Sequence, residues 1–407
     1  MRFLMLNWRD PKNPRAGGAE RVTLGYLAAL AQRGHEVFWF TYDFDGADAV
    51  ETIEGVTVVR GGSFLTSVTE AAVWCRTQKR FDLVIDQHHG IPWAAPLWCR
   101  TRCVAYIHEV LGPIWSAFYP WPLNEIGQWQ ERWTHRLYRH VPFWTASQFT
   151  KDALHRHGVR DVTLIPYGVH TIALPELDDK PLTSPLRLAV VCRLANNKRV
   201  DHALRAVKCL LERGVAAEIH VVGTGEAEAL VRRVAGALGL GARAVFTGPL
   251  PEPEKDALLR RAHVLLHTSQ REGWGLNVIE ANAMGTPAVV YPVAGLVEST
   301  LHRETGLVAK EETPDALADS VQDLLKAPET YQRYRRNAWE RAKTFHWSKV
   351  LPHACDWLEG QARREARVGG RQRTDDRETR LLDGSSGMGA GKSEIRIPRP
   401  EMDPKAE

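Results

Sequence analysis

The chain has 407 residues, of which 44% are hydrophobic and 25% are charged, and its formal net charge at pH 7 is +4. The length and composition are those of a folded protein with room for two domains, and they exclude a chain that is disordered throughout. The small positive charge is below what is typical of a dedicated nucleic-acid binder, so we expect no nucleic-acid partner.

The N-terminal segment lacks the apolar core of a secretory signal, because it carries Arg2 and turns polar at Asn7. No apolar run elsewhere reaches the length of a membrane span, and the six cysteines are too sparse for a disulfide scaffold. These features predict a cytoplasmic protein, and they leave association with the inner face of a membrane open.

Short apolar runs rich in β-branched residues alternate with amphipathic segments along most of the chain. This alternation is typical of parallel sheets with crossover helices, so we expect an α/β fold. In the first half, we predict a helix at 19–34 and strands at 1–8, 35–42, 81–87, 102–108 and 162–168. In the second half, we predict helices from about 199 and at 252–262, and strands at 186–194, 218–225, 244–248, 263–269 and 287–293.

A polar, proline-bearing stretch at residues 174–185 separates the two halves, and the strand–helix pattern begins again after it. We therefore predict two doubly wound, Rossmann-like domains.

The C-terminal segment is polar and poor in aromatic residues, which predicts a disordered tail. It contains SGMGAGKS, but Ser386 replaces the first glycine of a phosphate loop and no strand precedes it. The predicted limits are 1–175 and 184–345 for the domains, about 346–365 for a helix that packs back on the first domain, and 370–407 for the tail.

Loops that follow strands are the first candidates for a site, because ligands of doubly wound sheets bind beyond the carboxyl ends of the strands. Gly17 and Gly18 precede a helix whose N-terminal N–H groups suit an anion or sugar hydroxyls, although a turn with a positive φ explains them equally well. Arg193 ends one strand and Lys198 follows it before a helix. Both cations are expected at the sheet edge where a diphosphate would lie, and a solvated loop is the alternative.

Two glutamates flank a glycine turn and a helix start in the segment REGWGLNVIEANAMGTPAVV. Glu272 is expected in the loop and Glu280 on the helix, and eight residues at helical rise correspond to about 12 Å. This separation suits the two ends of one nucleotide sugar, with one carboxylate at the sugar hydroxyls and the other at the ribose hydroxyls. The backbone N–H groups of Trp274, Gly275 and Leu276 would face the diphosphate between them.

Taken in order, these segments resemble the retaining glycosyltransferases of family 4, which belong to the GT-B class. EGWGLNVIEANAMGTPAVV is similar to the E-x7-E segment of that family. Further similar segments follow in the expected order: GGAERV, IHE, TASQFTKDAL, IPYGV, VCRLANNKRVD, VVGTGEAEAL, FTGPLP, HTSQREGWGL and FHWSKV. The resemblance covers roughly residues 1–360 and implies an N-terminal acceptor-binding domain and a C-terminal nucleotide-sugar-binding domain that face a central cleft.

The resemblance also implies roles for individual side chains. Glu280 would bind the donor ribose diol, and Glu272 would meet the hydroxyls of the donor sugar. Arg193 and Lys198 would hold the diphosphate and stabilise its departure. His108, at the end of a first-domain strand, would reach into the cleft beside the transferred sugar. The new bond would keep the anomeric configuration of the donor, while the protein mainly orients and neutralises.

The remaining implied contacts come from glycine loops. Gly17 and Gly18 would border the acceptor and the phosphates, and the backbone of the loop that holds Gly223 and Gly225 would contact the nucleotide base. Tyr167 stands where asparagine is frequent in the family, so a polar contact from it to the donor or acceptor is not expected. No cofactor or divalent metal is expected, although residues 43–45 have the Asp-x-Asp spacing of the metal-dependent GT-A enzymes.

The expected reaction moves a sugar from a nucleotide-diphosphate sugar to a hydroxyl acceptor such as a lipid-linked or cell-envelope glycan. A nucleotide-sugar epimerase and a non-catalytic binding module are the alternatives. His88 and His89 end a strand, so one of them either lines the acceptor cleft or is structural. Residues 115–144 interleave aromatic and basic side chains, which suits helix packing or a lipid interface, and we expect weak peripheral membrane association.

Overall fold

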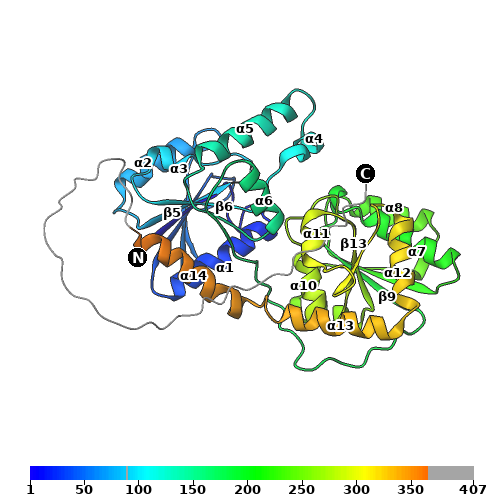
Figure 1. Cartoon of the computed structure of the whole chain (residues 1–407). Helices are drawn as coiled ribbons and strands as arrows, with labels where there is room; N and C mark the ends of the chain where they lie inside the picture. The colour runs from blue at the N-terminus through cyan, green and yellow to red at the C-terminus, as the bar shows by residue number, and fades with distance from the viewer. Residues whose placement is uncertain (89, 365–407) are drawn as a thin grey trace, which may run out of the picture. The chain divides into compact units, whose positions relative to one another are not determined.

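A computed structural model describes residues 1–88 and 90–364 of the chain (Figure 1). Three predictions concern segments outside these residues, namely the tail at 370–407, the phosphate-loop-like segment within it, and His89. The described residues form two predominantly parallel sheets with connecting helices, which confirms the predicted α/β class.

The first sheet has eight strands in the order β3-β4-β2-β1-β5-β6-β7-β8. All neighbouring strands are parallel except β3 and β4, an edge hairpin that the sequence patterns do not predict because β3 is short and largely exposed. The strands are Arg2–Leu6 (β1), Glu36–Thr41 (β2), Val50–Ile53 (β3), Val56–Arg60 (β4), Leu83–His88 (β5), Cys103–Ile107 (β6), Phe143–Thr145 (β7) and Val162–Leu164 (β8). The helices are Gly18–Gln32 (α1), Ser67–Thr77 (α2), Ala95–Trp98 (α3), Trp115–Phe118 (α4), Leu123–Leu137 (α5) and Gln148–Arg156 (α6).

The second sheet has six strands in the order β11-β10-β9-β12-β13-β14, and all neighbouring pairs are parallel. The strands are Leu186–Val191 (β9), Ala217–Val222 (β10), Ala244–Gly248 (β11), Val264–His267 (β12), Ala288–Val290 (β13) and Gly306–Val308 (β14). The helices are Val200–Glu212 (α7), Glu228–Ala237 (α8), Glu252–Arg261 (α9), Leu276–Ala283 (α10), Ala294–Ser299 (α11), Pro314–Leu325 (α12) and Pro328–Ala342 (α13).

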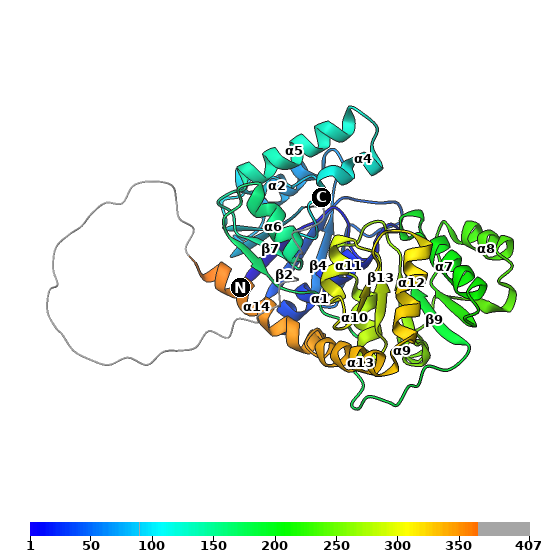
Figure 2. The same ribbon diagram turned by 45° about the vertical axis from the view of Figure 1, so that its right-hand side comes forward.

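The first sheet is covered by helices on both faces, because its strands bury side chains on both sides. Phe3 and Met5 belong to one core cluster together with Leu27 of α1, whereas Leu4 lies in a second cluster together with Ala71 of α2. Successive residues of a strand point to opposite faces, so one apolar run supplies both clusters. Figures 1 and 2 both show α1 on one side of this sheet and α5 and α6 on the other.

The last described helix, Trp347–Arg363 (α14), packs against α1 beside the first sheet. The Trp347 ring fills the space that side chains at Gly25 and Gly168 would occupy, since a Cβ atom at Gly168 would lie 2.3 Å from the ring. Arg33, which directly follows α1, also pairs with Asp356 at 2.6 Å. The chain therefore returns to its first half after completing the second sheet, while the residue limits of the two domains stay a prediction.

Helix length bears on the membrane question. The longest helix among residues 1–88 and 90–364 is α14, with 17 residues. No helix of this part of the chain is both long and apolar enough to cross a bilayer.

Candidate functional site

The loop between β12 and α10 holds the first of the two predicted glutamates. Gly275 begins α10 with a φ of 84°, where a Cβ atom would also lie 2.9 Å from the side chains of Leu296 and Ser299. Gly295 of α11 lets the same loop approach closely, because a Cβ atom there would lie 2.3 Å from the carbonyl oxygen of Glu272. Two glycines therefore fix the path of this loop.

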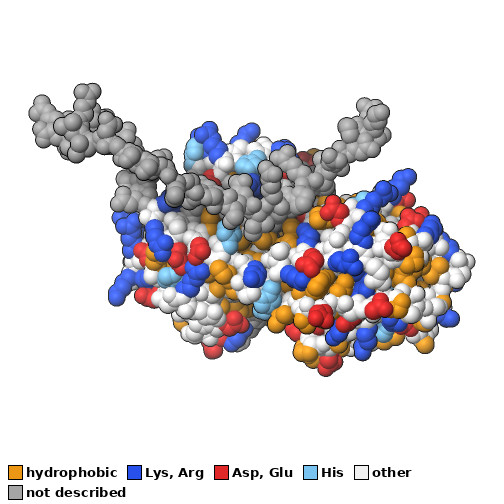
Figure 3. Space-filling model, turned by 60° about the horizontal axis from the view of Figure 1, so that its bottom comes forward, with side chains coloured by type: hydrophobic (Ala, Val, Ile, Leu, Met, Phe, Trp, Pro, Cys, Tyr) orange, Lys and Arg blue, Asp and Glu red, His pale blue; other side chains and the backbone are white. Residues whose placement is uncertain are grey.

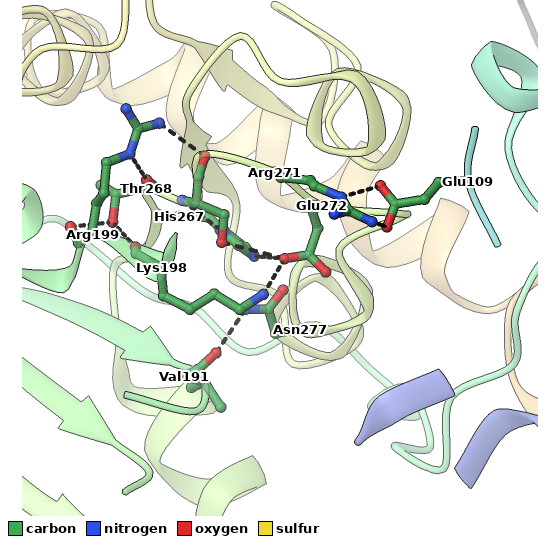
Figure 4. A network of polar contacts seen from close by, with 10 residues as sticks. Glu109, Val191, Lys198, Arg199, His267, Thr268, Arg271, Glu272 and Asn277 are labelled. Carbon is green, nitrogen blue, oxygen red and sulfur yellow. Dashed lines mark hydrogen bonds and ion pairs between the residues drawn. The ribbon is translucent and has the colours of Figure 1, made fainter. Parts of the chain in front are cut away.

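The carboxylate of Glu272 lies in a network of polar side chains (Figure 4). Its Oε2 atom is 2.6 Å from Lys198 Nζ, 3.3 Å from Ser269 Oγ and 3.5 Å from His267 Nε2. Burial alone would raise the pKa of Glu272, but Lys198 and His267 outweigh burial and the pKa lies below its ordinary value. The structure thus joins Glu272 and Lys198, as the sequence hypothesis of one shared site requires.

His267 ends β12 directly beneath this carboxylate. Burial lowers the pKa of His267 to about 4, although Glu272 opposes the shift. The imidazole is therefore neutral near pH 7, and the lysine supplies the full positive charge at Glu272.

Lys198 is held in place through its backbone and its neighbour. The hydroxyl of Thr268 donates to the carbonyl oxygen of Lys198 at 2.9 Å. Arg199 has a φ of 46° and donates to the carbonyl oxygens of Thr268 and Ser269 at 3.0 and 3.1 Å. The loop after β9 and the loop after β12 are consequently fastened to each other, which sets the position of the lysine side chain.

Arg193 lies on the same loop but outside this network. Its side chain is 67% exposed, and its guanidinium is 3.9 Å from Glu226. Gly223 and Gly225, which are expected to contact the nucleotide base, allow the loop after β9 to pack closely. A Cβ atom at Gly223 would lie 2.0 Å from Cys192 O, and one at Gly225 would lie 2.5 Å from Leu194 O. Contacts of Arg193, Gly223 and Gly225 with a donor stay predictions.

Glu280 lies on α10, as predicted, and belongs to a separate ion pair. Its Oε2 atom is 3.1 Å from Nζ of Lys255, a buried lysine that also lies 2.6 Å from Glu252. Burial raises the pKa of Glu280, and Lys255 only partly offsets that effect. The sequence reasoning missed Lys255, because a single lysine on α9 carries no local signal of a buried partner.

The backbone N–H groups expected at a diphosphate belong to Trp274, Gly275 and Leu276, at the start of α10. The Trp274 ring is buried and lies 5.8 Å from the ring of Phe345. Its side chain therefore packs in the core, and only its backbone can take part in the site.

Gly17 caps the N-terminus of α1, and Gly18 is the first residue of the helix. Gly17 has a φ of −139°, so a positive φ does not explain that glycine. Its N–H group donates to Oε2 of Glu20 at 2.7 Å, and Glu20 in turn pairs with Arg9 at 3.1 Å. A Cβ atom at Gly18 would meet nothing within 4 Å, which leaves room for a ligand at this helix N-terminus.

His108 directly follows β6, and polar side chains engage both of its ring nitrogens. The amide of Gln87 donates to Nε2 at 2.9 Å, which leaves the proton on Nδ1, and Nδ1 is bonded to the hydroxyl of Tyr167. Thr23 of α1 donates to Oε1 of Gln87 at 3.3 Å. Tyr167 therefore makes a polar contact after all, but with His108, and Gln87 is a second partner that the sequence did not reveal.

Glu109 connects His108 with the loop that carries Glu272. The carboxylate of Glu109 accepts two hydrogen bonds from Arg271, one of them at 2.6 Å (Figure 4). A Cβ atom at Gly273 would lie 3.9 Å from the carbonyl oxygen of His108. The end of β6 and the loop after β12 are thus neighbours, which brings His108 close to the loop that holds Glu272.

A second carboxylate links α11 and the start of α6. Glu298 accepts hydrogen bonds from the Ser147 hydroxyl and from the backbone N–H groups of Gln148 and Phe149, each at 2.7 Å. Ser147 also caps α6 by accepting from the N–H group of Thr150. The capping pattern is visible in the sequence, whereas the distant carboxylate is not.

Two other sequence candidates lie away from these loops. His88 is buried in β5, 3.8 Å from Asp86, and its ring stacks on that of His135. This placement supports the structural interpretation of His88. Within residues 1–88 and 90–364, no group of three or more His, Cys, Asp or Glu side chains is arranged to hold a metal ion, and the pair at 43–45 belongs to no such group.

Comparisons with known families place both halves of the chain. Residues 16–172 match Glycosyltransferase Family 4, and residues 178–341 match Glycosyl transferases group 1. A glycogen synthase from Mycobacterium tuberculosis is 30% identical over 383 residues, which cover 86% of this chain and 92% of that protein. A D-inositol 3-phosphate glycosyltransferase from Corynebacterium glutamicum is 32% identical over 182 residues, which cover 42% of this chain and 44% of that protein.

Solved structures share the fold at low sequence identity. A sucrose-phosphate synthase from Thermosynechococcus elongatus has a TM-score of 0.71 at 19% identity, with 88% of this chain and 98% of that chain covered. HepE of Anabaena, solved in complex with UDP-glucose, has a TM-score of 0.67 at 16% identity, with 88% of this chain and 100% of that chain covered.

The two sheets and the loops that meet at their carboxyl edges define a protein of the GT-B class. With the two family matches and a relative aligned over most of its length, the chain belongs to the glycosyltransferases of family 4, also described as glycosyl transferases group 1. It is therefore a sugar-transferring enzyme, and the relatives named above favour transfer over the epimerase and binding-module alternatives.

Proposed function

We propose that the enzyme takes a nucleotide-diphosphate sugar as donor and transfers the sugar to a hydroxyl group with retention at the anomeric carbon. The observation that carries this proposal is the ion pair of Lys198 with Glu272, next to the segment that carries His108. A neighbour in fold was solved with UDP-glucose, which supports a donor of this chemistry.

The ion pair of Lys198 with Glu272 would rearrange as the donor binds. An ammonium group has three N–H donors, and one of them serves Glu272 in the free enzyme, so Lys198 can bridge the carboxylate and a phosphate oxygen. Glu272, kept ionised by Lys198, would then accept hydrogen bonds from hydroxyls of the sugar. Glu280 would accept those of the ribose, and the N–H groups at the start of α10 would face the diphosphate.

Sugar transfer would not require a side chain of the protein to act as a general acid or base. The bond between the anomeric carbon and the diphosphate oxygen breaks, and the acceptor oxygen forms its bond on the same face of the sugar. The acceptor proton passes to the departing phosphate. Lys198 and Arg193 would stabilise the charge that develops on the leaving group, so we propose no requirement for a divalent metal.

His108 would orient the transferred sugar rather than act as a nucleophile. Gln87 and Tyr167 hold its ring from both sides, and such fixed neighbours favour positioning. Gly17 and Gly18 would leave room for the acceptor and the phosphates at the start of α1.

The acceptor is proposed to be a lipid-linked or cell-envelope glycan. One further relative, a GDP-mannose-dependent alpha-(1-6)-phosphatidylinositol dimannoside mannosyltransferase from Mycobacterium tuberculosis, is 30% identical over 210 residues, or 50% of this chain and 53% of that protein. Its name includes a lipid-linked acceptor, and such an acceptor would bring this enzyme into weak peripheral contact with the inner face of a membrane.

The decisive experiment is a thermal-shift panel with UDP, GDP, ADP and dTDP sugars, repeated on the Glu280→Ala variant. One donor class should raise the melting temperature of the wild type, and Glu280→Ala should weaken that effect. The chosen donor is then incubated with glycan acceptors in EDTA, and the product anomer is assigned by NMR. An inverted anomer, or a transfer that starts only when manganese is added, would overturn the mechanism proposed here.

A further inference from the structure

A basic depression lies between α5 and α6, on the face of the first sheet opposite α1. Its volume is about 390 Å³. The side chains that line it come from α5, α6 and the segments that follow them, and five of the seven lining residues are arginines. They are Arg132, Arg136, Arg139, Arg156 and Arg160, together with His157 and Gly158.

These arginines have no acidic partners among the described residues. Arg132 donates to a backbone carbonyl at 3.3 Å, Arg139 lies 3.0 Å from a ring nitrogen of His140, and Arg156 lies over the ring of Phe149. No ion pair joins any of the five to a carboxylate within residues 1–88 and 90–364. On the face shown in Figure 3, by contrast, basic and acidic side chains are intermixed.

Five like charges around one depression repel one another unless an anion neutralises them, because they lie within the screening length of physiological salt. The pKa of His157, which also lines the depression, is affected by the same arginines. Burial lowers the pKa of His157, and Arg132, Arg156 and Arg136 lower it further. His157 is 2.7 Å from His135, whose pKa burial lowers to about 2, so a neutral ring and no carboxylate lies on its inner side.

An exposed apolar row runs along α5 beside the arginines. Trp129 is 65% exposed and Trp133 is 50% exposed, and their rings stack with centroids 6.3 Å apart. Leu123, Ile126 and Leu137 are also exposed. At 3.6 residues per turn, this row and the arginines of α5 occupy adjacent parts of its outer surface, while Glu131, Thr134 and His135 are buried on its inner side.

Large apolar side chains that remain exposed next to basic groups are typical of a surface with a partner. A helix with tryptophans on one part of its exposed surface and arginines on the next suits the boundary between lipid headgroups and acyl chains. A soluble anion would satisfy the arginines but would leave the row of tryptophans in water. The two observations together therefore favour a bilayer over a free phosphate.

We propose that α5 and the arginine depression form a docking surface for an anionic bilayer, with lipid phosphates in the depression and Trp129 and Trp133 at the headgroup boundary. This inference deepens the membrane association proposed above by naming the surface and the lipid charge. The proposed lipid-linked acceptor explains why the enzyme would bind a bilayer. Binding itself is measured without turnover, so it is tested separately from the transferase proposal.

The test is flotation of the full chain with two kinds of vesicle at low salt. Vesicles that contain phosphatidylglycerol should carry the protein upward, and vesicles of phosphatidylcholine alone should not. High salt should release the protein, because the arginine contribution is screened. Equal binding to both vesicles, or no binding to either, would overturn the proposal. Inorganic phosphate is titrated in parallel, and phosphate binding without vesicle binding would identify a soluble-anion site and also overturn it.

Variants locate the surface. Arg132→Gln with Arg136→Gln should weaken vesicle binding at low salt on the order of 25-fold, at roughly fivefold per arginine. Trp129→Ser with Trp133→Ser should also weaken it at low salt, although the net charge of the protein is unchanged. The matched control is Arg233→Gln with Arg243→Gln, which removes the same charge from the second half of the chain.

An equal loss in the control would show that net charge, not this surface, binds the vesicles, and it would refute the assignment. Unchanged melting temperatures establish that the variants are folded. Turnover on a soluble acceptor should persist in all of them, so a failure of docking is distinguishable from a failure of the transferase proposal.

Discussion

Lys198 sets the ionisation of Glu272, because it is the nearest cation to a carboxylate that burial would otherwise keep protonated. The pKa of Glu272 lies below its ordinary value of 4.5 only while Lys198 and His267 oppose burial. The folded pKa is thus depressed, and the ion pair stabilises the fold above about pH 4.5. This contribution is lost as the pH falls through the folded pKa.

We expect Lys198→Ala to lower kcat by about 10² to 10³, since a charge that stabilises the leaving group is removed. Burial then acts unopposed by the lysine, so the pKa of Glu272 rises and the acid limb of the pH–rate profile moves to higher pH. Steady-state kinetics over a pH series measure both effects. The control is Lys326→Ala, an exposed lysine that pairs with Asp323. An unmoved acid limb would contradict the role given to Lys198.

Tyr167→Phe removes the hydroxyl that holds Nδ1 of His108. We expect a loss of about 1 kcal/mol in the free energy of unfolding and a fall in kcat of about tenfold, with the donor KM nearly unchanged, because the ring loses its orientation. Tyr331→Phe is the matched control, since its buried hydroxyl donates to the carbonyl oxygen of His263 at 3.0 Å. If both variants lose stability and both keep full turnover, Tyr167 has only a structural role.

Gly18→Ala tests whether a ligand approaches the start of α1. The added methyl group meets no protein atom within 4 Å, so we expect stability to stay the same or to rise by up to about 1 kcal/mol. Turnover should nevertheless fall, because the methyl group occupies space assigned to the acceptor and the phosphates. Gly236→Ala in α8, which is equally open, should leave turnover intact. Full activity of Gly18→Ala would show that no ligand approaches this end of α1.

At the scale of elements, each site loop is fastened by contacts from a helix or loop that is distant in the sequence. Arg199 fastens the loop after β12, Glu109 holds Arg271, and Glu298 of α11 holds the first N–H groups of α6. A carboxylate at a helix N-terminus also interacts favourably with the helix dipole. The positions of the site loops are therefore set by these pairs of residues as much as by the strands that the loops follow.

Glu298→Gln should loosen the start of α6 by about 2 kcal/mol, because an amide nitrogen replaces an oxygen that accepts from backbone N–H groups. Hydrogen exchange at Gln148 and Phe149 measures the local effect, and thermal denaturation measures the global one. Glu340→Gln is the control, since that glutamate pairs with Lys343 on the surface, where such pairs contribute little. Exchange rates that rise equally in both variants would show that the Glu298 contact is not specific.

At the scale of the whole molecule, the α/β class was predictable because buried parallel strands leave apolar runs between amphipathic helices. Lys198 and Glu272 could be predicted to lie together because the loops after strands lie at one edge of a sheet, and the structure joins them. The position of Glu280 on α10 could be predicted because Gly275 marks a helix start. The partners of these residues were not predictable. Glu298 contacts Ser147 across 151 positions of the chain, and neither residue carries a local sign of the other. The buried Lys255 and the hydrogen bond of Tyr167 with His108 depend in the same way on tertiary packing.

The return of α14 to the first sheet has a consequence for biosynthesis. Trp347 closes the core beside Gly25 and Gly168, yet it is translated after every strand of both sheets. While the ribosome makes the second half, the apolar side chains of the first half that pack on α14 therefore stay uncovered, and transiently exposed apolar surface favours aggregation. The core of the first half beside Gly25 and Gly168 can therefore be completed only after nearly the whole described chain has been synthesised.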